Sequence, residues 1–191
     1  MGYDLRLLTA GVDQLQYLQQ HPEHTADFLG GRRPVREERE VVRGWFKTTE
    51  RVYMVPVDLS CTWPDSEPMV VDLVSRAGLY YMLNGTDEAC VSVTNFPNVG
   101  GRYRGEMLGE AIELGHTGFG HAHAFMPGSV AKLHAALSSI DEPTLTARAR
   151  HIATAMEWDD ALDDVPNDMK KLRAVVDEAV QSEQGLVWYW G

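Results

Sequence analysis

The chain has 191 residues, of which 44% are hydrophobic and 24% are charged, and its formal net charge is -11. This length and composition predict one globular domain, spanning 1–191, with a full hydrophobic core rather than a disordered chain. Most of the acidic excess lies in the last two thirds of the sequence. Because nucleic-acid binding needs a positive surface, the charge argues against a nucleic-acid partner. It favours a basic protein partner or a cation, or serves only to keep the protein soluble.

The cysteines and the N-terminus bear on the cellular compartment. Cys61 and Cys90 belong to no CxxC pair, which predicts free thiols in a reducing environment, with a single disulfide as the alternative. The N-terminus has no basic segment followed by an apolar stretch, and no apolar run approaches the roughly 20 residues of a membrane span. We therefore expect a cytoplasmic protein without a membrane partner.

The first third of the chain predicts a strand followed by helices. Residues 2–8 alternate between apolar and polar positions, as a strand does. Thr9 is expected to cap a helix, because Leu15 and Leu18 recur at helical spacing. Pro22 is expected to open a second, shorter helix.

Residues 32–51 are dense in arginine and glutamate and predict a solvated helix face with mixed ion pairs. The alternation of Tyr53, Val55 and Val57 predicts a strand, and Pro56 places that strand at a sheet edge.

The middle of the sequence predicts a helix and then a long loop. Apolar residues at spacings of three and four predict one buried helical stripe over 70–81. Residues 89–94 are expected to form a short strand. The glycine-rich segment 95–120 predicts a long loop region, with a helix around 107–114 as the one alternative.

The last third is the most regular. Residues 121–125 predict a strand, and Pro127 lies where a first helical turn accepts proline. Asp141 is expected to cap a second helix, and Pro166 to start the last one, which ends at Gly185. The buried faces of these helices are predicted to contain Val130, Leu133, Ala136, Leu137, Leu145, Ala149, Ile152, Ala153, Met169, Leu172, Val176 and Ala179.

A closing strand over 186–190 completes the pattern. With strands at both chain termini and helices between them, the sequence predicts an α+β fold, in which several helices cover a mixed β-sheet.

A family resemblance supports this fold class. The run Ala-His-Ala-Phe-Met-Pro at 122–127 leads into an apolar helix and a second, Asp-capped helix. Together with Ala-Gly-Leu-Tyr-Tyr-Met-Leu-Asn-Gly at 77–85 and the closing Leu-Val-Trp-Tyr-Trp at 186–190, this order resembles the YfbM-like family of small bacterial domains of unknown function. The resemblance implies an α+β fold in one YfbM-like domain. It implies no established activity and no catalytic residues. The stretch 86–120 departs from the family by its length and its glycine content.

Three histidines form the first candidate site. In a strand, His121 and His123 point to the same face, and a glycine-containing turn could bring His116 beside them. Three imidazoles with water in the fourth position are a zinc ligand set typical of hydrolases. The alternative is that these histidines pack at strand ends and bind no metal. No other cofactor is expected, because the phosphate-binding, dinucleotide-binding and nucleophile-elbow motifs are absent from the sequence.

An acidic segment forms the second candidate site. Its carboxylates could bind a hard cation, could form a docking patch for a basic partner, or could lie at the start of a helix, where acids interact favourably with the helix dipole. The segment contains Glu157, Asp159, Asp160, Asp163 and Asp164.

Two functional hypotheses follow. The first is a non-catalytic binding or interaction module, of an immunity or regulatory type, that masks a basic partner. The second is a small metal-dependent hydrolase that uses the histidine cluster.

Overall fold

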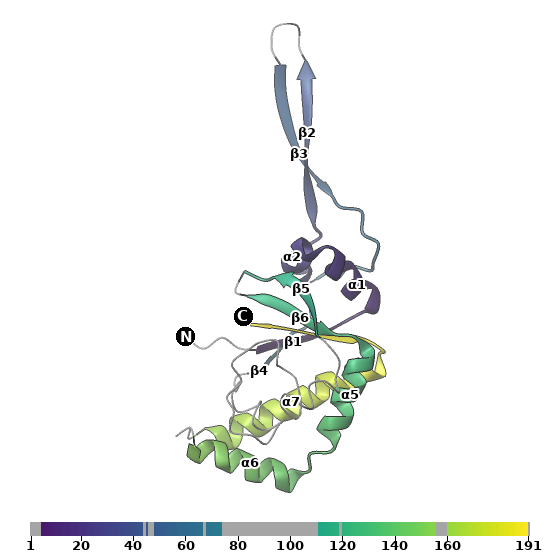
Figure 1. Ribbon diagram of the computed structural model, residues 1–191. Coiled ribbons are helices and arrows are strands. Elements are labelled where there is room, and N and C mark those ends of the chain that lie inside the picture. Colours follow the sequence, from purple (N-terminus) through teal and green to yellow (C-terminus); the bar gives the residue numbers. More distant parts are fainter. Residues whose placement is uncertain are drawn as a thin grey trace.

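A five-stranded sheet in the order β4-β1-β7-β6-β5 forms the centre of the computed structural model (Figure 1). The structure describes residues 5–43, 45, 48–66, 68–73, 111–118, 120–155 and 160–190. The strands of this sheet are β1 (Leu5–Ala10), β4 (Val71–Leu73), β5 (Ile112–His116), β6 (His121–Phe125) and β7 (Gly185–Trp190).

The α+β class, with strands from both ends of the chain in one sheet, is confirmed. Every pairing between the described strands of this sheet is antiparallel, so the expectation of a mixed sheet is corrected. The reason lies in the connections. β5 and β6 form a hairpin, and the three helices after β6 return the chain to the end of the sheet where β6 stops, so that Phe125 pairs with Leu186. A parallel neighbour would need a crossover to the opposite end.

Helices cover both faces of the sheet (Figure 1). Because side chains alternate along a strand, Leu5 and Leu7 join one buried cluster while Leu8 and Ala10 join the other. The first cluster packs against α5 (Pro127–Ser138), α6 (Glu142–Ala155) and α7 (Ala161–Gln181). The second packs against α1 (Val12–Gln20) and α2 (Thr25–Leu29), which are joined by the 3-10 turn η1 (Pro22–His24).

The C-terminal helices follow the sequence prediction closely, except at the two ends of α7. This helix ends at Gln181, and Gly185, which was predicted to end it, is the first residue of β7. Pro127 is in the first turn of α5, and the Asp141 carboxylate caps α6 by accepting a hydrogen bond from the Thr144 N–H at 2.9 Å. α7, however, begins at Ala161, and Pro166 lies inside it rather than at its start. The proline removes only one backbone hydrogen bond, close to the solvated first turns of a 21-residue helix.

The start of α1 also differs from the prediction. Thr9 is part of β1, and Gly11 is the residue that precedes the helix. The Gly11 N–H donates to the Gln14 side-chain oxygen at 2.8 Å, as the third helical residue does in a capping box. The short helical piece opening at Pro22 is confirmed as η1 and α2.

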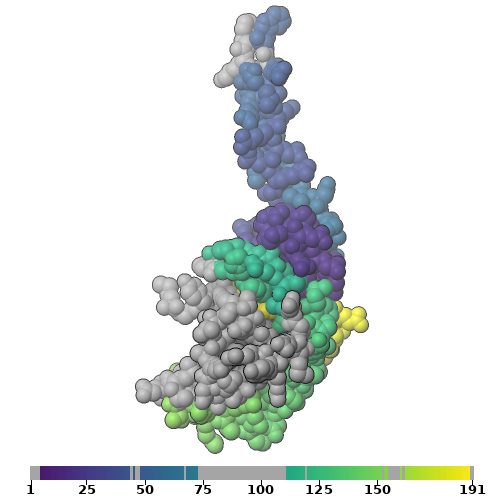
Figure 2. Space-filling view, in the orientation of Figure 1, coloured from purple at the N-terminus to yellow at the C-terminus, as the bar shows by residue number. Residues whose placement is uncertain are grey.

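The predicted helix over 32–51 is wrong, because this segment forms a long two-stranded hairpin that projects from the body (Figures 1 and 2). β2 (Val35–Arg43) pairs with β3 (Thr48–Pro56), and we call this hairpin the arm. The predicted strand around Tyr53 is therefore part of β3. Arginine and glutamate alternate in sign two residues apart, and a strand brings such residues together: Arg36 lies 2.7 Å from Glu38 and Arg39 lies 2.6 Å from Glu37.

Two predictions in the middle of the chain are corrected where the structure describes it. Residues 71–73 form strand β4 rather than helix, and residues 112–116 form strand β5 rather than loop or helix. The remainder of the predicted helix over 70–81, the strand over 89–94 and the loop up to residue 110 lie outside the described residues. Among the described helices, none has the length and apolar character needed to cross a membrane.

Candidate functional site

The structure places His116 and His121 opposite each other on β5 and β6, with ring centroids 5.2 Å apart. The His121 Nδ1 atom lies 2.6 Å from the Glu113 carboxylate, and the His116 Nδ1 atom accepts a hydrogen bond from the Gly118 N–H at 2.9 Å. These contacts engage one nitrogen of each ring in local hydrogen bonds next to the turn of the β5–β6 hairpin.

His123, unlike the exposed His116 and His121, is buried beside Trp188 of the core cluster that contains residues of α5, α6 and α7. Its ring stacks on Trp188 at a centroid distance of 5.9 Å, and only 6% of the residue is exposed. Within the described part of the chain, His116, His121 and His123 do not form a group whose ligand atoms converge on one point. The zinc site predicted on these three residues therefore gains no support from their geometry.

Burial of His123 predicts a pH dependence of stability. Desolvation lowers its pKa below the ordinary 6.5, against a smaller opposing effect of Glu113, with His121 lowering it further. The unfolded chain takes up the proton first, so the contribution to stability is present above pH 6.5 and is lost as the pH falls from 6.5 through the folded-state pKa. We expect the free energy of unfolding to fall in this window by at most about 1.4 kcal/mol per pH unit.

The substitution His123→Phe should remove this slope, because phenylalanine keeps the ring against Trp188 and cannot titrate. Urea unfolding between pH 4.5 and 7.5 measures it, and His134→Gln, at a partly exposed position, is the matched control. An acid slope that is unchanged in His123→Phe would contradict the assignment.

The predicted acidic patch lies at the N-terminus of α7, as far as it is described. Asp163 and Asp164 are in the first turn, and their backbone N–H groups donate to the Asp160 carbonyl at 3.0 and 2.9 Å. Negative charge in this place stabilises the helix dipole, which accounts for these carboxylates without a ligand. Glu157 and Asp159 lie outside the described residues.

A second group of possible metal ligands, which the sequence analysis did not select, lies at η1. His21, Glu23 and His24 bring one ligand atom each within 4.8 Å of the others. The Glu23 carboxylate lies 3.4 Å from the His21 Nδ1 atom and 4.0 Å from the His24 Nε2 atom. A 3-10 turn places residues three apart on the same side, and the two imidazoles accordingly stack at 5.7 Å.

Tyr17 orients this group from α1. Its hydroxyl lies 2.8 Å from the His24 Nδ1 atom, which leaves the Nε2 atom directed to Glu23. Burial, with smaller effects of Cys61 and Glu23, raises the pKa of Tyr17, so the phenol stays protonated. The pKa of Glu23 is lowered, first by its own backbone N–H and then by His21 and His24, so the carboxylate is ionised. Two imidazoles and one carboxylate are a ligand set for zinc and other divalent transition metals.

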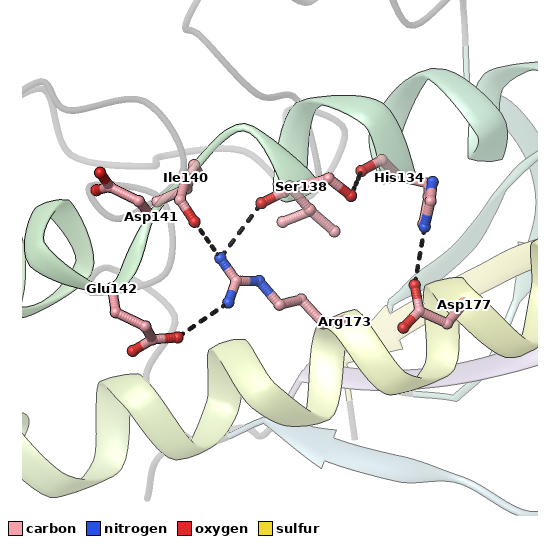
Figure 3. Close-up of a pocket in the computed structure, with 8 residues that line it drawn as sticks. His134, Ser138, Ile140, Asp141, Glu142, Arg173 and Asp177 are labelled. Atoms are coloured by element: carbon pink, nitrogen blue, oxygen red, sulfur yellow. Dashed lines mark hydrogen bonds and ion pairs between the residues drawn. The ribbon is translucent and has the colours of Figure 1, made fainter.

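A cleft between α5, α6 and α7 is occupied by protein contacts (Figure 3). Arg173 of α7 reaches across it and donates to the carbonyl oxygens of Ile140 at 2.5 Å and Leu137 at 3.3 Å, and it pairs with Glu142 at 3.4 Å. His134 pairs with Asp177 at 3.0 Å. These interactions join the α5–α6 turn to α7, so we assign the cleft a structural role.

A pocket of about 460 Å³ lies at the base of the arm. Trp63 forms one wall, with its ring edge-on to Phe28 at 5.4 Å and to Tyr17 at 5.8 Å, and its indole N–H donates to the Arg32 carbonyl at 3.0 Å. The segment that carries Trp63 is fixed to α1, because the Thr62 N–H donates to the Asp13 carboxylate at 2.9 Å. The wall is therefore rigidly connected to the body.

The arm itself exposes apolar side chains. Trp45 at its tip is 95% exposed, and Val41, Val52 and Met54 are each more than half exposed. Side chains alternate along a strand, and opposite residues of an antiparallel pair share a face. Val35, Val41, Val52 and Met54 therefore lie on one face of the arm, interspersed with charged residues such as Glu37, Arg39 and Glu50. Large exposed apolar side chains in one place mark interaction surfaces.

Comparisons with known proteins identify no relative: no protein-family model matches the chain, and neither a curated protein nor a solved structure matches it. The fold defines an α+β protein, in which helices cover both faces of an antiparallel sheet and a two-stranded arm projects from the body.

Proposed function

We propose that the protein is a non-catalytic binding module and that the arm is its docking element. The observation that supports this most is the exposure of the arm: two nine-residue strands with no buried side chain, and four large exposed apolar side chains on one face. A two-stranded hairpin is marginally stable alone, and an exposed strand edge is a template for another strand. A partner that covers the arm would supply both missing interactions.

The charge of the molecule bears on the kind of partner. The net charge of -11 and the acidic start of α7 favour association with a basic protein, as an immunity-type or regulatory protein would need. The YfbM-like resemblance adds an expectation of a bacterial origin and no activity.

Removal of the arm tests this function. The Val57 N–H donates to the Pro34 carbonyl at 3.0 Å, so the two ends of the arm are adjacent and a short glycine-serine turn can replace residues 35–56. We expect the trimmed protein to fold and to lose partner capture, measured by affinity purification at low and high salt. Equal capture by the full and trimmed proteins would refute the arm as the docking element.

A metal-dependent hydrolase is the second candidate function, favoured by the convergence of His21, Glu23 and His24. A divalent ion held by these three groups would keep open positions for water, and a metal-bound water is a nucleophile at neutral pH. The exposed position of Glu23 would give a substrate access.

Calorimetric titration of the protein with Zn²⁺ tests this candidate. We expect one site in the wild type, loss of binding in His24→Ala, and affinity about 10-fold weaker in Tyr17→Phe, which removes the group that orients the imidazole. His116→Ala is the matched control and should bind as the wild type does. Loss of binding in His116→Ala with retention in His24→Ala would move the site to the β5–β6 histidines.

A further inference from the structure

The outer edge of β2 is open, and its backbone N–H and C=O groups alternate between those that bond to β3 and those that point away from it. The two-stranded sheet contains only β2 and β3 among the described strands. The hydrogen bond from the Val57 N–H to the Pro34 carbonyl fixes the alternation of the ladder. The even-numbered residues of β2 therefore bond to β3, and the N–H and C=O groups of the odd-numbered residues point away from β3, towards the open edge.

Charged side chains usually protect an open edge from pairing. In β2 the charges have both signs, and residues 35–41 read Val-Arg-Glu-Glu-Arg-Glu-Val. This order is complementary in charge to an antiparallel copy of the same segment centred on Glu38. Reversing the strand about this residue places arginine opposite glutamate on both sides of the centre and valine opposite valine beyond them.

We infer that the occupant of this edge is a second copy of the same chain, with the two β2 strands antiparallel about Glu38. This inference rests on the proposed function of the arm as the docking element, and it takes a second copy of this chain, instead of a basic protein, as the partner that the arm itself binds. In this register Arg36 lies opposite Glu40 of the second copy, and Glu37 lies opposite Arg39 of the second copy. The pairing forms four cross-strand ion pairs, and opposite charges that face each other across two strands stabilise a sheet. The one like-charged contact, Glu38 with its own copy, has Arg36 beside it at 2.7 Å.

The hydrogen-bonding phase selects this register from its neighbours. The backbone N–H and C=O groups that point to the open edge belong to odd-numbered residues. An odd-numbered residue of one copy must therefore lie opposite an odd-numbered residue of the other, which limits the possible registers. A centre at Arg39 would place Arg39 against itself and Glu38 against Glu40. A centre at Glu37 would place Glu37 against itself. The β3 edge lacks this complementarity, and Pro56 has no N–H to donate there.

The same register joins the exposed apolar groups of the two arms. Val35 of one copy lies opposite Val41 of the other, on the face that also carries Val52 and Met54. The result is a four-stranded sheet in which the exposed apolar side chains of both arms lie on one face, beside the Glu37–Arg39 ion pairs, whereas the single arm has only two strands. Three or more strands with a hydrophobic face are what an independent sheet needs for stability.

The pairing also brings the tip of each arm to the base of the other. Trp45 of one copy reaches the level of Gly31 of the second copy, at the pocket of about 460 Å³ that Trp63 lines. A tryptophan in a pocket is a typical source of binding energy at an interface. Arg43 arrives beside Arg33 and Asp65, so this end of the contact carries charges of both signs.

Two charge-reversal variants test the register. In Glu37→Arg, arginine faces arginine across the dyad, and in Arg39→Glu, glutamate faces glutamate, so each variant alone should be a monomer of 21.4 kDa. An equimolar mixture of the two restores opposite charges at all four positions and should give a heterodimer of twice that mass. Light scattering after gel filtration at up to about 100 µM, well above the Kd of a standard-size interface, measures this.

Covalent trapping and the tip supply independent readouts. Glu38→Cys should form a disulfide-linked dimer on mild oxidation, because Glu38 meets its own copy, whereas Glu40→Cys should not. Trp45→Ala should weaken dimerisation by about 30-fold, as expected for a central interface tryptophan.

A wild-type protein that stays monomeric at these concentrations would overturn the inference. So would a dimer that persists in both single charge variants, because it would use another surface. If the arm captures a different protein while the wild type is monomeric, the proposed function stands and the self-pairing fails. If the arm captures nothing and no dimer forms, both fail.

Discussion

Substitution of Gly115 by alanine should destabilise the protein by about 3 kcal/mol or more, because the residue lies where β5 packs against η1 without space for a side chain. Its φ of 146° is in the region that favours glycine, and an added Cβ would collide with the Pro22 carbonyl oxygen. The Cβ would also lie 2.8 Å from the Thr25 hydroxyl, which is buried and donates to the Leu114 carbonyl at 2.9 Å. Relief of the collision therefore breaks a buried hydrogen bond.

Urea unfolding of Gly115→Ala measures this effect, and Gly118→Ala is the matched control. Gly118 also has a positive φ, of 97°, but nothing lies within 4 Å of the position of an added Cβ. The control should therefore cost only the backbone strain, about 1 kcal/mol. Similar losses in both variants would show that packing against η1 is not the cause. Because Pro22 belongs to η1, Gly115→Ala should also weaken any metal binding at His24.

Removal of the Arg173 side chain by substitution with alanine should cost about 3 kcal/mol. The guanidinium donates to two carbonyl oxygens at the end of α5 and pairs with Glu142 at the start of α6 (Figure 3). Hydrogen bonds from a charged donor contribute about 1.5–3 kcal/mol each. The alanine variant removes this donor from both carbonyls, although the Leu137 carbonyl still accepts from the Ile140 N–H at 3.2 Å. In the wild type, part of the stabilisation by these hydrogen bonds is offset, because the buried Arg173 Nε atom has no hydrogen-bond partner among the described residues.

Thermal and urea unfolding measure the Arg173→Ala effect. Lys170→Ala, on the exposed side of the same helix, is the control and should change stability by less than about 0.5 kcal/mol. Arg173→Lys should recover only part of the loss, since one ammonium group cannot reproduce the planar arrangement of donors. A loss below about 1 kcal/mol in Arg173→Ala would contradict the role of this residue as the link between α5, α6 and α7.

The sequence predicted the elements whose stability comes from one apolar face. Leu133 and Leu137 of α5, and Leu172 and Val176 of α7, repeat at helical spacing and are buried. The α+β class followed from the strands at the two chain ends. The antiparallel pairing did not, because the direction of a strand depends on where its connection returns.

The arm was misassigned for a physical reason. Glutamate and arginine have high helix propensity, and the run of charges around Glu38 suits ion pairs at helical spacing. The decisive signal was the alternation of sign at a spacing of two, which pairs Arg36 with Glu38 and Glu37 with Arg39 on opposite faces of a strand. Because the arm buries almost nothing, no hydrophobic period marked β2 as a strand, and only Tyr53 and Val55 near the end of β3 showed an alternation.

The candidate site was only partly accessible from sequence. The predicted partners His121 and His123 do share a strand, but the packing of His123 on Trp188 depends on β7, which is far away in sequence. The group at His21 and His24 could have been found locally, since Pro22 predicts a tight helical turn and such a turn aligns residues three apart. Its orientation by Tyr17 required the fold.

Site-specific photo-crosslinking in cells tests most directly whether the arm binds a partner. A photoreactive residue at Met54, which is 63% exposed on the arm, should give a covalent adduct with another polypeptide. The same residue at Leu162, which is 49% exposed on α7, should give none. An adduct from Leu162 and none from Met54 would contradict the account, because the docking surface would then lie on the body of the protein and not on the arm.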